Sequence, residues 1–421
     1  MLMKVLWITN VLLPEAVALL LGKHLHKGSG GWLVSSADAL VMSGAVELYI
    51  VSISSKVSQL TTLSGQYMTY YVLPYRSHVQ AYESLMIEVN KQVNPDVVHI
   101  HGTEWPYGLA YMKACGSDNV VISLQGLLGV IASCYTDGLT YGQIISNITV
   151  RDIIGKTILG EKRDYERRAG FEVEALKKTK HVIGRTMFDK KYVFSFNPEL
   201  NYHFCNESLR DEFYEAVWSY DKCIPHTIFL SQANYPIKGL HQILKALPIV
   251  LKKYPDVKVR VAGTDITLHN SLSDLKRFSG YGKIIYKLIC KYHLQNVVSF
   301  TGLLTAQEMV NEFLSCNMYV CPSSCENSSN SIAEAQILGV PCLASNRGGN
   351  PDMITNEKYG ELYDFYDIQG LAEKICDIFE SSVSFNNSYV RSMARCRHDK
   401  RANLETTIAI YESIMNQCNG E

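Results

Sequence analysis

The sequence lacks several features that mark particular classes of protein. Its charges nearly cancel, with 40 Lys and Arg against 41 Asp and Glu, which argues against a dedicated nucleic-acid binder. The 12 cysteines are scattered without CxxC or Cys/His pairing, which favours reduced thiols in a cytosolic protein over disulfides or a zinc site. Nowhere does an uninterrupted apolar run reach the roughly 18 residues that a membrane span needs.

The N-terminal residues contain an apolar run of the kind that a signal peptide also has. Pro14 and Glu15 interrupt this run, so we expect a buried strand over residues 4–9 that ends in a loop. On this interpretation the chain is cytoplasmic.

Short apolar runs alternate with longer amphipathic stretches in two successive series. The first series has predicted strands at residues 4–9, 46–54, 96–102, 119–127 and 181–186, with helices at 33–42 and 82–93. Residues 193–218 do not show this alternation, and we expect them to connect the two domains. The second series has predicted strands at 226–232, 257–263, 297–302, 318–323 and 341–345, with helices at 238–254, 305–316, 331–339 and 368–381.

Strands that alternate with helices twice over predict an α/β chain with two Rossmann-like parallel-sheet domains. We place the first at residues 1–220 and the second at 221–403, with a C-terminal helix at 404–421 that packs back on the first. Such domains bind ligands beyond the carboxyl ends of their strands, so two domains that face each other would form a binding cleft.

Two glutamates, Glu326 and Glu334, flank a Ser/Asn-rich loop ahead of a predicted helix. One interpretation is structural, because Ser331 and Glu334 have the spacing of a capping box. The other is functional: a helix that begins near Ser331 offers an anion site for a diphosphate. Carboxylates on either side would accept hydrogen bonds from the diols of a ribose and a sugar ring. The pattern therefore suits a nucleotide diphosphate sugar, and both interpretations remain open.

Four segments together resemble the retaining glycosyltransferases of family 4, which have the GT-B fold. The Glu-x7-Glu stretch follows "CPS" and precedes "EAQILGVPCLASNRGG", as the donor motif of that family does. The segment "NYPIKGLHQILKALPIVL" resembles the Lys-Gly segment that begins the second domain, "PDVVHIHG" resembles a strand of the acceptor domain, and "SGGW" resembles its glycine loop. The resemblance covers roughly residues 4–411, and the glutamate spacing together with Lys238-Gly239 makes it specific.

The resemblance implies a role for each matching residue. Residues 1–220 would bind the acceptor and residues 221–403 the nucleotide-sugar donor. Lys238 would neutralise the diphosphate as its bond to the sugar breaks, Glu326 would hold sugar hydroxyls, and Glu334 would hold the ribose. Backbone amides around Asn330 and Ser331 would complete the anion cradle.

Glycines and two departures from the family pattern complete the predicted site. Gly239 belongs to the Lys-Gly pair, and Gly31, after Gly30, would let the backbone approach the substrate closely. Gln232 stands where the family commonly has an arginine, so either this phosphate contact is neutral or another cation such as Arg185 supplies it. Gln125 stands where an acceptor-domain histidine is usual. His101 lies nearby, but a packing role suits it better. We expect no metal and no cofactor besides the donor substrate.

The expected activity is a retaining, metal-independent transfer of a sugar from a nucleotide diphosphate sugar to a hydroxyl of a glycan or lipid-linked acceptor in bacterial polysaccharide biosynthesis. The alternatives are a nucleotide-sugar epimerase of the same architecture and an inactive nucleotide-sugar-binding subunit. Residues 151–191 are rich in Lys and Arg with apolar residues interleaved. This stretch either docks on anionic lipid at the cytoplasmic face of the inner membrane or forms a solvated helix face.

Overall fold

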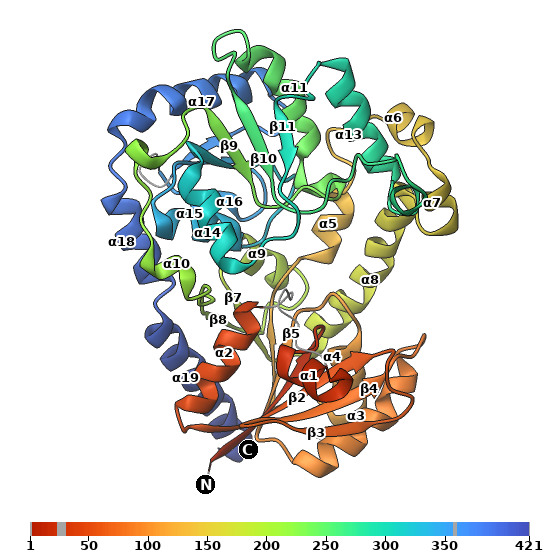
Figure 1. Ribbon diagram of the computed structural model, residues 1–421. Helices are drawn as coiled ribbons and strands as arrows, with labels where there is room; N and C mark the ends of the chain where they lie inside the picture. The colour runs from red at the N-terminus through yellow and green to blue at the C-terminus, as the bar shows by residue number, and fades with distance from the viewer. Residues whose placement is uncertain (1, 23–30, 357–359, 421) are drawn as a thin grey trace. The chain divides into compact units, whose positions relative to one another are not determined.

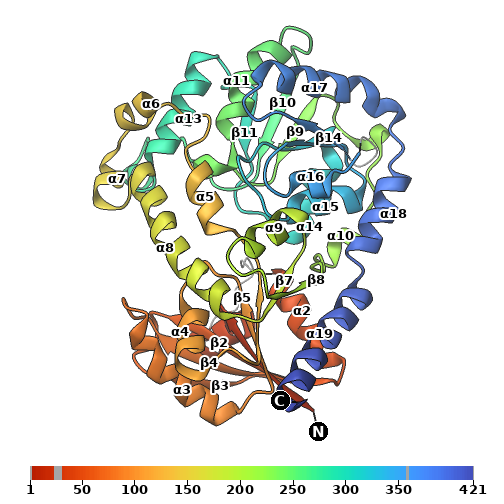
Figure 2. The same cartoon turned by 180° about the vertical axis from the view of Figure 1, so that it is seen from behind.

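The computed structural model describes residues 2–22, 31–356 and 360–420, and the chain divides into two compact units. Unit 1 comprises Met1–Gly129, Arg167–Arg210 and His398–Glu421, and unit 2 comprises Val130–Glu166 and Asp211–Arg397. Figures 1 and 2 show the elements of each unit from opposite sides. Each unit is built on one sheet.

The sheet of unit 1 has eight described strands in the order β3-β4-β2-β1-β5-β6-β7-β8, and all neighbours are parallel except β3 and β4. Long apolar runs form its centre because parallel strands are covered on both faces; all five residues of β5, for example, are buried. The strands are β1 Met3–Thr9, β2 Val46–Ser54, β3 Thr61–Ser64, β4 Thr69–Pro74, β5 Val97–His101, β6 Val120–Ser123, β7 His181–Gly184 and β8 Asn201–Phe204.

Helices α2 (Gly31–Met42) and α19 (Lys400–Gly420) pack against each other on one face of this sheet. Their apolar side chains share a core with Val5 and Trp7 of β1, and the Trp7 indole donates a hydrogen bond to the Tyr411 hydroxyl of α19 at 3.1 Å. Other helices that lie wholly in unit 1 are α1 Pro14–Leu21, α3 Gln80–Val93, α4 Tyr107–Cys115 and α9 Met187–Phe194.

The sheet of unit 2 has six described strands, all parallel, in the order β11-β10-β9-β12-β13-β14. They are β9 Thr227–Leu230, β10 Lys258–Val261, β11 Val298–Phe300, β12 Met318–Cys321, β13 Cys342–Ser345 and β14 Glu361–Tyr363.

The helices of unit 2 connect these strands or flank the sheet. They are α6 Tyr141–Ser146, α7 Val150–Ile154, α10 Glu212–Glu215, α11 Leu240–Val250, α12 Leu272–Leu275, α13 Gly280–Lys291, α14 Ala306–Ser315, α15 Asn330–Leu338, α16 Asn350–Met353, α17 Ile368–Ser381 and α18 Ser388–Arg397, with short 3-10 turns η1 Tyr220–Lys222, η2 Pro236–Lys238 and η3 Ser382–Ser384. Two further helices, α5 Leu128–Cys134 and α8 Ile158–Lys178, contain two of the four points where the chain passes between units.

The prediction of two parallel-sheet α/β units is confirmed, but several details differ. Residues 193–218 are not only a connection, because β8 within them adds an eighth strand beside β7. The compact units also divide the chain differently from the predicted boundaries at 220 and 403. Residues Val130–Glu166 group with unit 2, where Asp137 pairs with Arg347, and the chain returns to unit 1 at His398, before α19 begins.

Candidate functional site

Two loops of unit 2 emerge side by side at one edge of its sheet. Strands β9 and β12 are parallel neighbours, so the loops that follow them leave at the same carboxyl edge. A backbone hydrogen bond of 2.8 Å from the Ser324 amide to the Ile237 carbonyl joins the two loops. The first loop carries Lys238 and the second carries Glu326, although 88 residues separate them in the sequence.

Gly239 allows the first loop to approach the second. Its φ of +73° lies in the left-handed region, which residues other than glycine rarely adopt. A Cβ atom at this position would lie 1.8 Å from the carbonyl oxygen of Pro322, far inside contact distance. Any larger residue at this position of the Lys-Gly pair would therefore clash with the second loop.

Lys238 and Glu326 form an ion pair, with 2.7 Å between the lysine Nζ and the carboxylate Oε1. Both side chains are mostly buried, 19% and 16% exposed. The Ser323 hydroxyl donates a second hydrogen bond of 2.6 Å to the same Glu326 oxygen. Burial disfavours the charged ammonium, but the adjacent Glu326 carboxylate more than offsets burial, so the pKa of Lys238 lies above its ordinary value. Lys238 is therefore a cation at neutral pH.

The backbone of Glu326 is held by a third loop, which follows β13. The Gly349 amide donates a hydrogen bond of 2.8 Å to the Glu326 carbonyl. Gly348 has a φ of +59°, and a Cβ atom there would lie 2.1 Å from the same carbonyl oxygen. The glycine pair of "NRGG" thus fits closely around Glu326, and loops from three neighbouring strands converge on this residue.

Helix α15 begins at Asn330, directly after this site. Its N-cap is Ser329, whose hydroxyl accepts a hydrogen bond of 3.4 Å from the Ile332 amide. The capping-box interpretation of Ser331 and Glu334 is therefore wrong, because the cap lies two residues earlier and Glu334 lies in the second turn. Glu334 is nevertheless buried, with 6% of its surface exposed. The first amides of a helix have no partner within the helix, so this N-terminus carries partial positive charge.

Arg347 and Asp137 were not among the predicted site residues. Arg347 precedes the glycine pair, and its guanidinium lies 3.2 Å from the Asp137 carboxylate and over the rings of Phe365 and Tyr366. Asp137 comes from the segment Val130–Glu166, so this pair ties that segment to the loop that supports Glu326. The 210 residues between the partners leave no local sequence signal.

Residues 225–395, which hold all of this geometry except Asp137, match the family model described as glycosyl transferases group 1. Over this region the chain is similar to that family. Among curated relatives, spore coat protein SA of Bacillus subtilis is 28% identical over 182 residues, which are 42% of this chain and 46% of that protein. The chain thus spans about half the length of the curated relatives it matches.

Solved structures of GT-B glycosyltransferases show the same fold over nearly the whole chain. Sucrose-phosphate synthase from Thermosynechococcus elongatus has a TM-score of 0.71 at 13% identity, covering 99% of this chain and 100% of that one. HepE of Anabaena, in a complex with UDP-glucose, has a TM-score of 0.63 at 15% identity, covering 98% and 99%. At these identities the likeness establishes the fold, and it confirms the predicted GT-B class.

The other predicted residues of the family pattern fall in both units. Gln232 is exposed in the loop after β9 and hydrogen-bonds with Tyr235, whose ring centroid lies 5.9 Å from the Lys238 Nζ. Gly31 belongs to unit 1, where it begins α2, and Gly30 lies outside the described residues.

Arg185 and Gln125, also of unit 1, both bind Glu207. Gln125 donates a hydrogen bond of 2.8 Å to the Glu207 carboxylate, and the buried Arg185 guanidinium forms an ion pair with it. Arg185 also donates a hydrogen bond of 2.5 Å to the Leu124 carbonyl. The Arg185 side chain therefore has both its ion-pair partner and a hydrogen-bond acceptor within unit 1.

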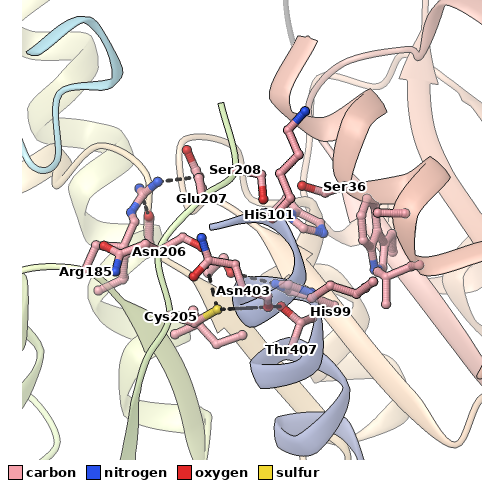
Figure 3. Close-up of a pocket in the computed structure, with 18 residues that line it drawn as sticks. Ser36, His99, His101, Arg185, Cys205, Asn206, Glu207, Ser208, Asn403 and Thr407 are labelled. Carbon is pink, nitrogen blue, oxygen red and sulfur yellow. Dashed lines mark hydrogen bonds and ion pairs between the residues drawn. The ribbon is translucent and has the colours of Figure 1, made fainter. Parts of the chain in front are cut away.

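Unit 1 contains a pocket between α2, α19 and the carboxyl ends of β5 to β8 (Figure 3). It encloses roughly 630 Å³ of empty space, part of it open to solvent. His99 lies at its floor, with one ring nitrogen 2.5 Å from the Tyr411 hydroxyl and the other 2.7 Å from the Ser123 hydroxyl. Burial lowers the pKa of His99 to about 3, so its imidazole is neutral. His101 stacks on it with 3.8 Å between centroids, as its predicted packing role requires.

In the part of the chain that the structure describes, no cluster of three or more His, Cys, Asp or Glu side chains is arranged to hold a metal ion. Within residues 2–22, 31–356 and 360–420, no helix combines the length and apolar character needed to cross a membrane.

Proposed function

We propose that the protein is a retaining glycosyltransferase that moves a sugar from a nucleotide diphosphate sugar to a hydroxyl of a glycan or lipid-linked acceptor. The observation that carries this proposal is the Lys238–Glu326 pair, held by three converging loops ahead of the N-terminus of α15, within the region that matches the family. HepE, which shares the fold, is known in a complex with UDP-glucose, and this supports a donor of the same class here.

The spacing within the site supports a division of roles. A diphosphate that approaches the Lys238 ammonium and the N-terminus of α15 would place its sugar beside Glu326, because that carboxylate lies 2.7 Å from the lysine Nζ. We assign Glu326 to the sugar hydroxyls, and the amides of Asn330 and Ser331 to the phosphates. Glu334, buried in the second turn, is assigned to the ribose. Gln232 would contribute a neutral contact.

The proposed reaction is driven by stabilisation of the leaving group. The bond between the anomeric carbon and the phosphate oxygen breaks, and Lys238 and the helix dipole offset the charge that develops on the diphosphate. The acceptor hydroxyl attacks from the same face and passes its proton to the departing phosphate oxygen. The configuration at the anomeric carbon is then retained. Because protein groups carry the charge, this step needs no divalent ion.

The acceptor is assigned to unit 1, which extends the interpretation of this unit as the acceptor-binding half. Its pocket presents the hydroxyl of Ser36 and the amide of Asn403 beside the apolar walls of Trp7 and Leu404. Hydroxyl and amide groups beside apolar surface are suited to a sugar ring. We infer that the product belongs to a bacterial surface polysaccharide built at the cytoplasmic face of the inner membrane.

A donor assay separates the proposed transferase from an epimerase and from an inactive binder. Nucleoside diphosphates are first screened by thermal shift, because a ligand of the native state raises its melting temperature. The matching donor is then incubated with and without acceptor. A transferase releases nucleoside diphosphate faster with acceptor, an epimerase changes the sugar alone, and a binder does neither.

The stereochemistry and the ion dependence test the mechanism. We expect the NMR signal of the product's anomeric proton to show the donor's configuration, and the rate to be unchanged in EDTA. An inverted product, or activity that EDTA abolishes and magnesium restores, would exclude the proposed mechanism.

A further inference from the structure

Helix α7 (Val150–Ile154) of unit 2 buries its acidic side chain and exposes its apolar ones. Its carboxylate residue, Asp152, is 3% exposed, whereas Val150, Ile153 and Ile154 are 72%, 75% and 83% exposed. Amphipathic helices of globular proteins normally bury the apolar side chains and expose the charged ones. Three adjacent aliphatic side chains in water add little to folding stability, and they would gain free energy if another apolar surface covered them.

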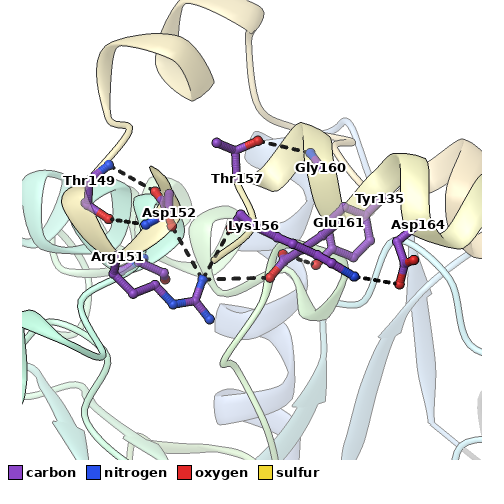
Figure 4. Close-up of polar contacts among 11 residues, drawn as sticks. Tyr135, Thr149, Arg151, Asp152, Lys156, Thr157, Gly160, Glu161 and Asp164 are labelled. Atoms are coloured by element: carbon purple, nitrogen blue, oxygen red, sulfur yellow. Dashed lines mark hydrogen bonds and ion pairs between the residues drawn. The ribbon is translucent and has the colours of Figure 1, made fainter. Parts of the chain in front are cut away.

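The polar contacts of α7 fix this orientation (Figure 4). Thr149 and Asp152 form a reciprocal capping box, with hydrogen bonds of 3.0 and 3.3 Å. Arg151 contacts the Asp152 and Glu161 carboxylates at 3.4 and 3.9 Å and donates a hydrogen bond to the Lys156 carbonyl. These contacts hold Asp152 toward the protein and leave Ile153 and Ile154 on the opposite, exposed side of the helix.

The neighbouring helices α6 and α12 also expose apolar side chains. In α6, Tyr141 is 71% exposed, and this helix packs against α13. Helix α13 begins at Gly280, where a Cβ atom would lie 2.7 Å from the Asp152 carboxylate, so α7 sits against its N-terminus. The short helix α12 leads into this contact and exposes Leu272 by 81%. We call Tyr141, Val150, Ile153, Ile154 and Leu272 the apolar platform.

Positive charge accompanies the platform. Residues 268–291, which run from before α12 through α13, contain five Lys or Arg and one Asp, in a chain whose net charge is −1. Lys276, Arg277 and Lys287 among them are exposed. The predicted basic stretch 151–191 is mixed: Lys156 pairs with Asp164, and Arg168 and Arg185 are buried. Other basic side chains of the stretch are exposed, among them Arg163, Arg167 and Lys177.

We propose that the apolar platform docks unit 2 on the surface of an anionic lipid bilayer. Exposed aliphatic side chains and a tyrosine would enter the interface, while the adjacent lysines and arginine would meet lipid phosphates. A second copy of the chain is a poorer occupant, because a two-fold symmetric contact sets identical surfaces face to face and would oppose the positive segments. This docking is independent of donor turnover, so its failure and that of the proposed function are distinguishable.

Vesicle flotation tests the proposal with the full-length protein. Vesicles of phosphatidylcholine with about a third phosphatidylglycerol should capture the protein at low salt. Capture should weaken as salt rises, because exposed charges are screened over about 8 Å at physiological ionic strength. Vesicles of phosphatidylcholine alone should capture less. The double variant Ile153→Ser/Ile154→Ser should lower the partition coefficient at least about tenfold.

Matched variants separate docking from general loss of hydrophobicity. Ile153→Leu/Ile154→Leu keeps the apolar area and should bind vesicles as the parent does. Val383→Ser removes a side chain that is 64% exposed in η3 and should also leave binding unchanged. Circular dichroism and thermal melting confirm that each variant folds.

Three results would overturn the proposal. One is no capture at low salt, and another is equal capture of the parent and the serine double variant. The third is concentration-dependent dimerisation that the serine variant abolishes while vesicle binding is absent, since a second copy would then cover the platform.

Discussion

Replacing Lys238 with methionine tests the pair at the centre of the proposed donor site. The substitution keeps the length of the side chain and removes its charge. It leaves the Glu326 carboxylate, 16% exposed, with the Ser323 hydroxyl still donating to it. Loss of one partner of a buried ion pair typically costs about 3–5 kcal/mol. Because some solvent reaches Glu326 and Ser323 remains, we expect the free energy of unfolding to fall by about 2 kcal/mol.

The double variant Lys238→Met/Glu326→Gln separates stability from catalysis. It removes the uncompensated carboxylate, so most of the lost free energy of unfolding should return. The neutral amide cannot replace the ammonium at a diphosphate, so turnover should be about 10²–10³ below that of the parent in the single variant. It should be no higher in the double variant, which also lacks the carboxylate assigned to the sugar hydroxyls. A purely structural pair would recover activity along with stability.

Urea unfolding and donor turnover provide the two measurements. Trp218 is the tryptophan of unit 2, and it is buried, so the fluorescence change that a Trp218→Phe control removes reports on this unit. An equal slope of the free energy of unfolding against urea concentration in all variants would show that the same unfolding transition is compared. If the double variant is as unstable as the single one, the electrostatic reasoning is wrong. Near-normal turnover in Lys238→Met would remove the lysine from the mechanism.

Three further predictions follow from the same region. Gly239→Ala should lower the free energy of unfolding by more than about 2 kcal/mol, since the left-handed backbone alone costs about 1–2 kcal/mol and the new Cβ meets a carbonyl at 1.8 Å; Gly142→Ala, with open space around it, is the control for urea unfolding. Glu334→Gln should weaken binding of both free nucleoside diphosphate and donor in calorimetry, whereas Glu326→Gln should affect the donor alone; equal losses for Glu326→Gln would contradict the assigned roles. Burial lowers the pKa of His241 to about 3, so below pH ~6.5 the unfolded chain binds a proton at this residue that the folded chain does not. His241 should therefore contribute a fall in the free energy of unfolding of about 1.4 kcal/mol per unit of decreasing pH down to roughly pH 3, beside a similar contribution from His99. His241→Gln should reduce the slope by this amount in pH-dependent unfolding, and an unchanged slope would count against a neutral buried imidazole.

Strands buried on both faces were predictable because each is a compact apolar run. β5, with its "VVHIH" sequence, is one example, and five of the six described strands of unit 2 were found in the same way. The buried strand β4 and the short strand β14 were not predicted. Strand β8 was missed because Asn201–Phe204 is only half-buried and joins the sheet edge through backbone pairing with β7. Backbone pairing leaves no mark on the hydrophobic pattern, so an edge strand of this kind cannot be read from its side chains.

The site residues themselves were identifiable, but their partners were not. The Lys-Gly pair and the two glutamates stand out by spacing, whereas the contact of Arg347 with Asp137 depends on how the chain folds back. The start of α15 was misplaced for a related reason. A loop rich in serine offers several possible caps, and the glycines of "NRGG", which fit around Glu326, help to set the path of this loop ahead of Ser329.

The interleaving of the two units limits how this chain can recombine with its relatives. The backbone passes from one unit to the other after Gly129, Glu166, Arg210 and Arg397, so neither unit is a continuous gene segment. A hybrid made with one crossover near residue 220 would take Asp137 from one parent and Arg347 from the other. Exchange of a donor unit between homologues would have to move residues 130–166 and 211–397 together, and shuffled libraries should yield folded hybrids mainly where both parents carry a compatible pair at these positions.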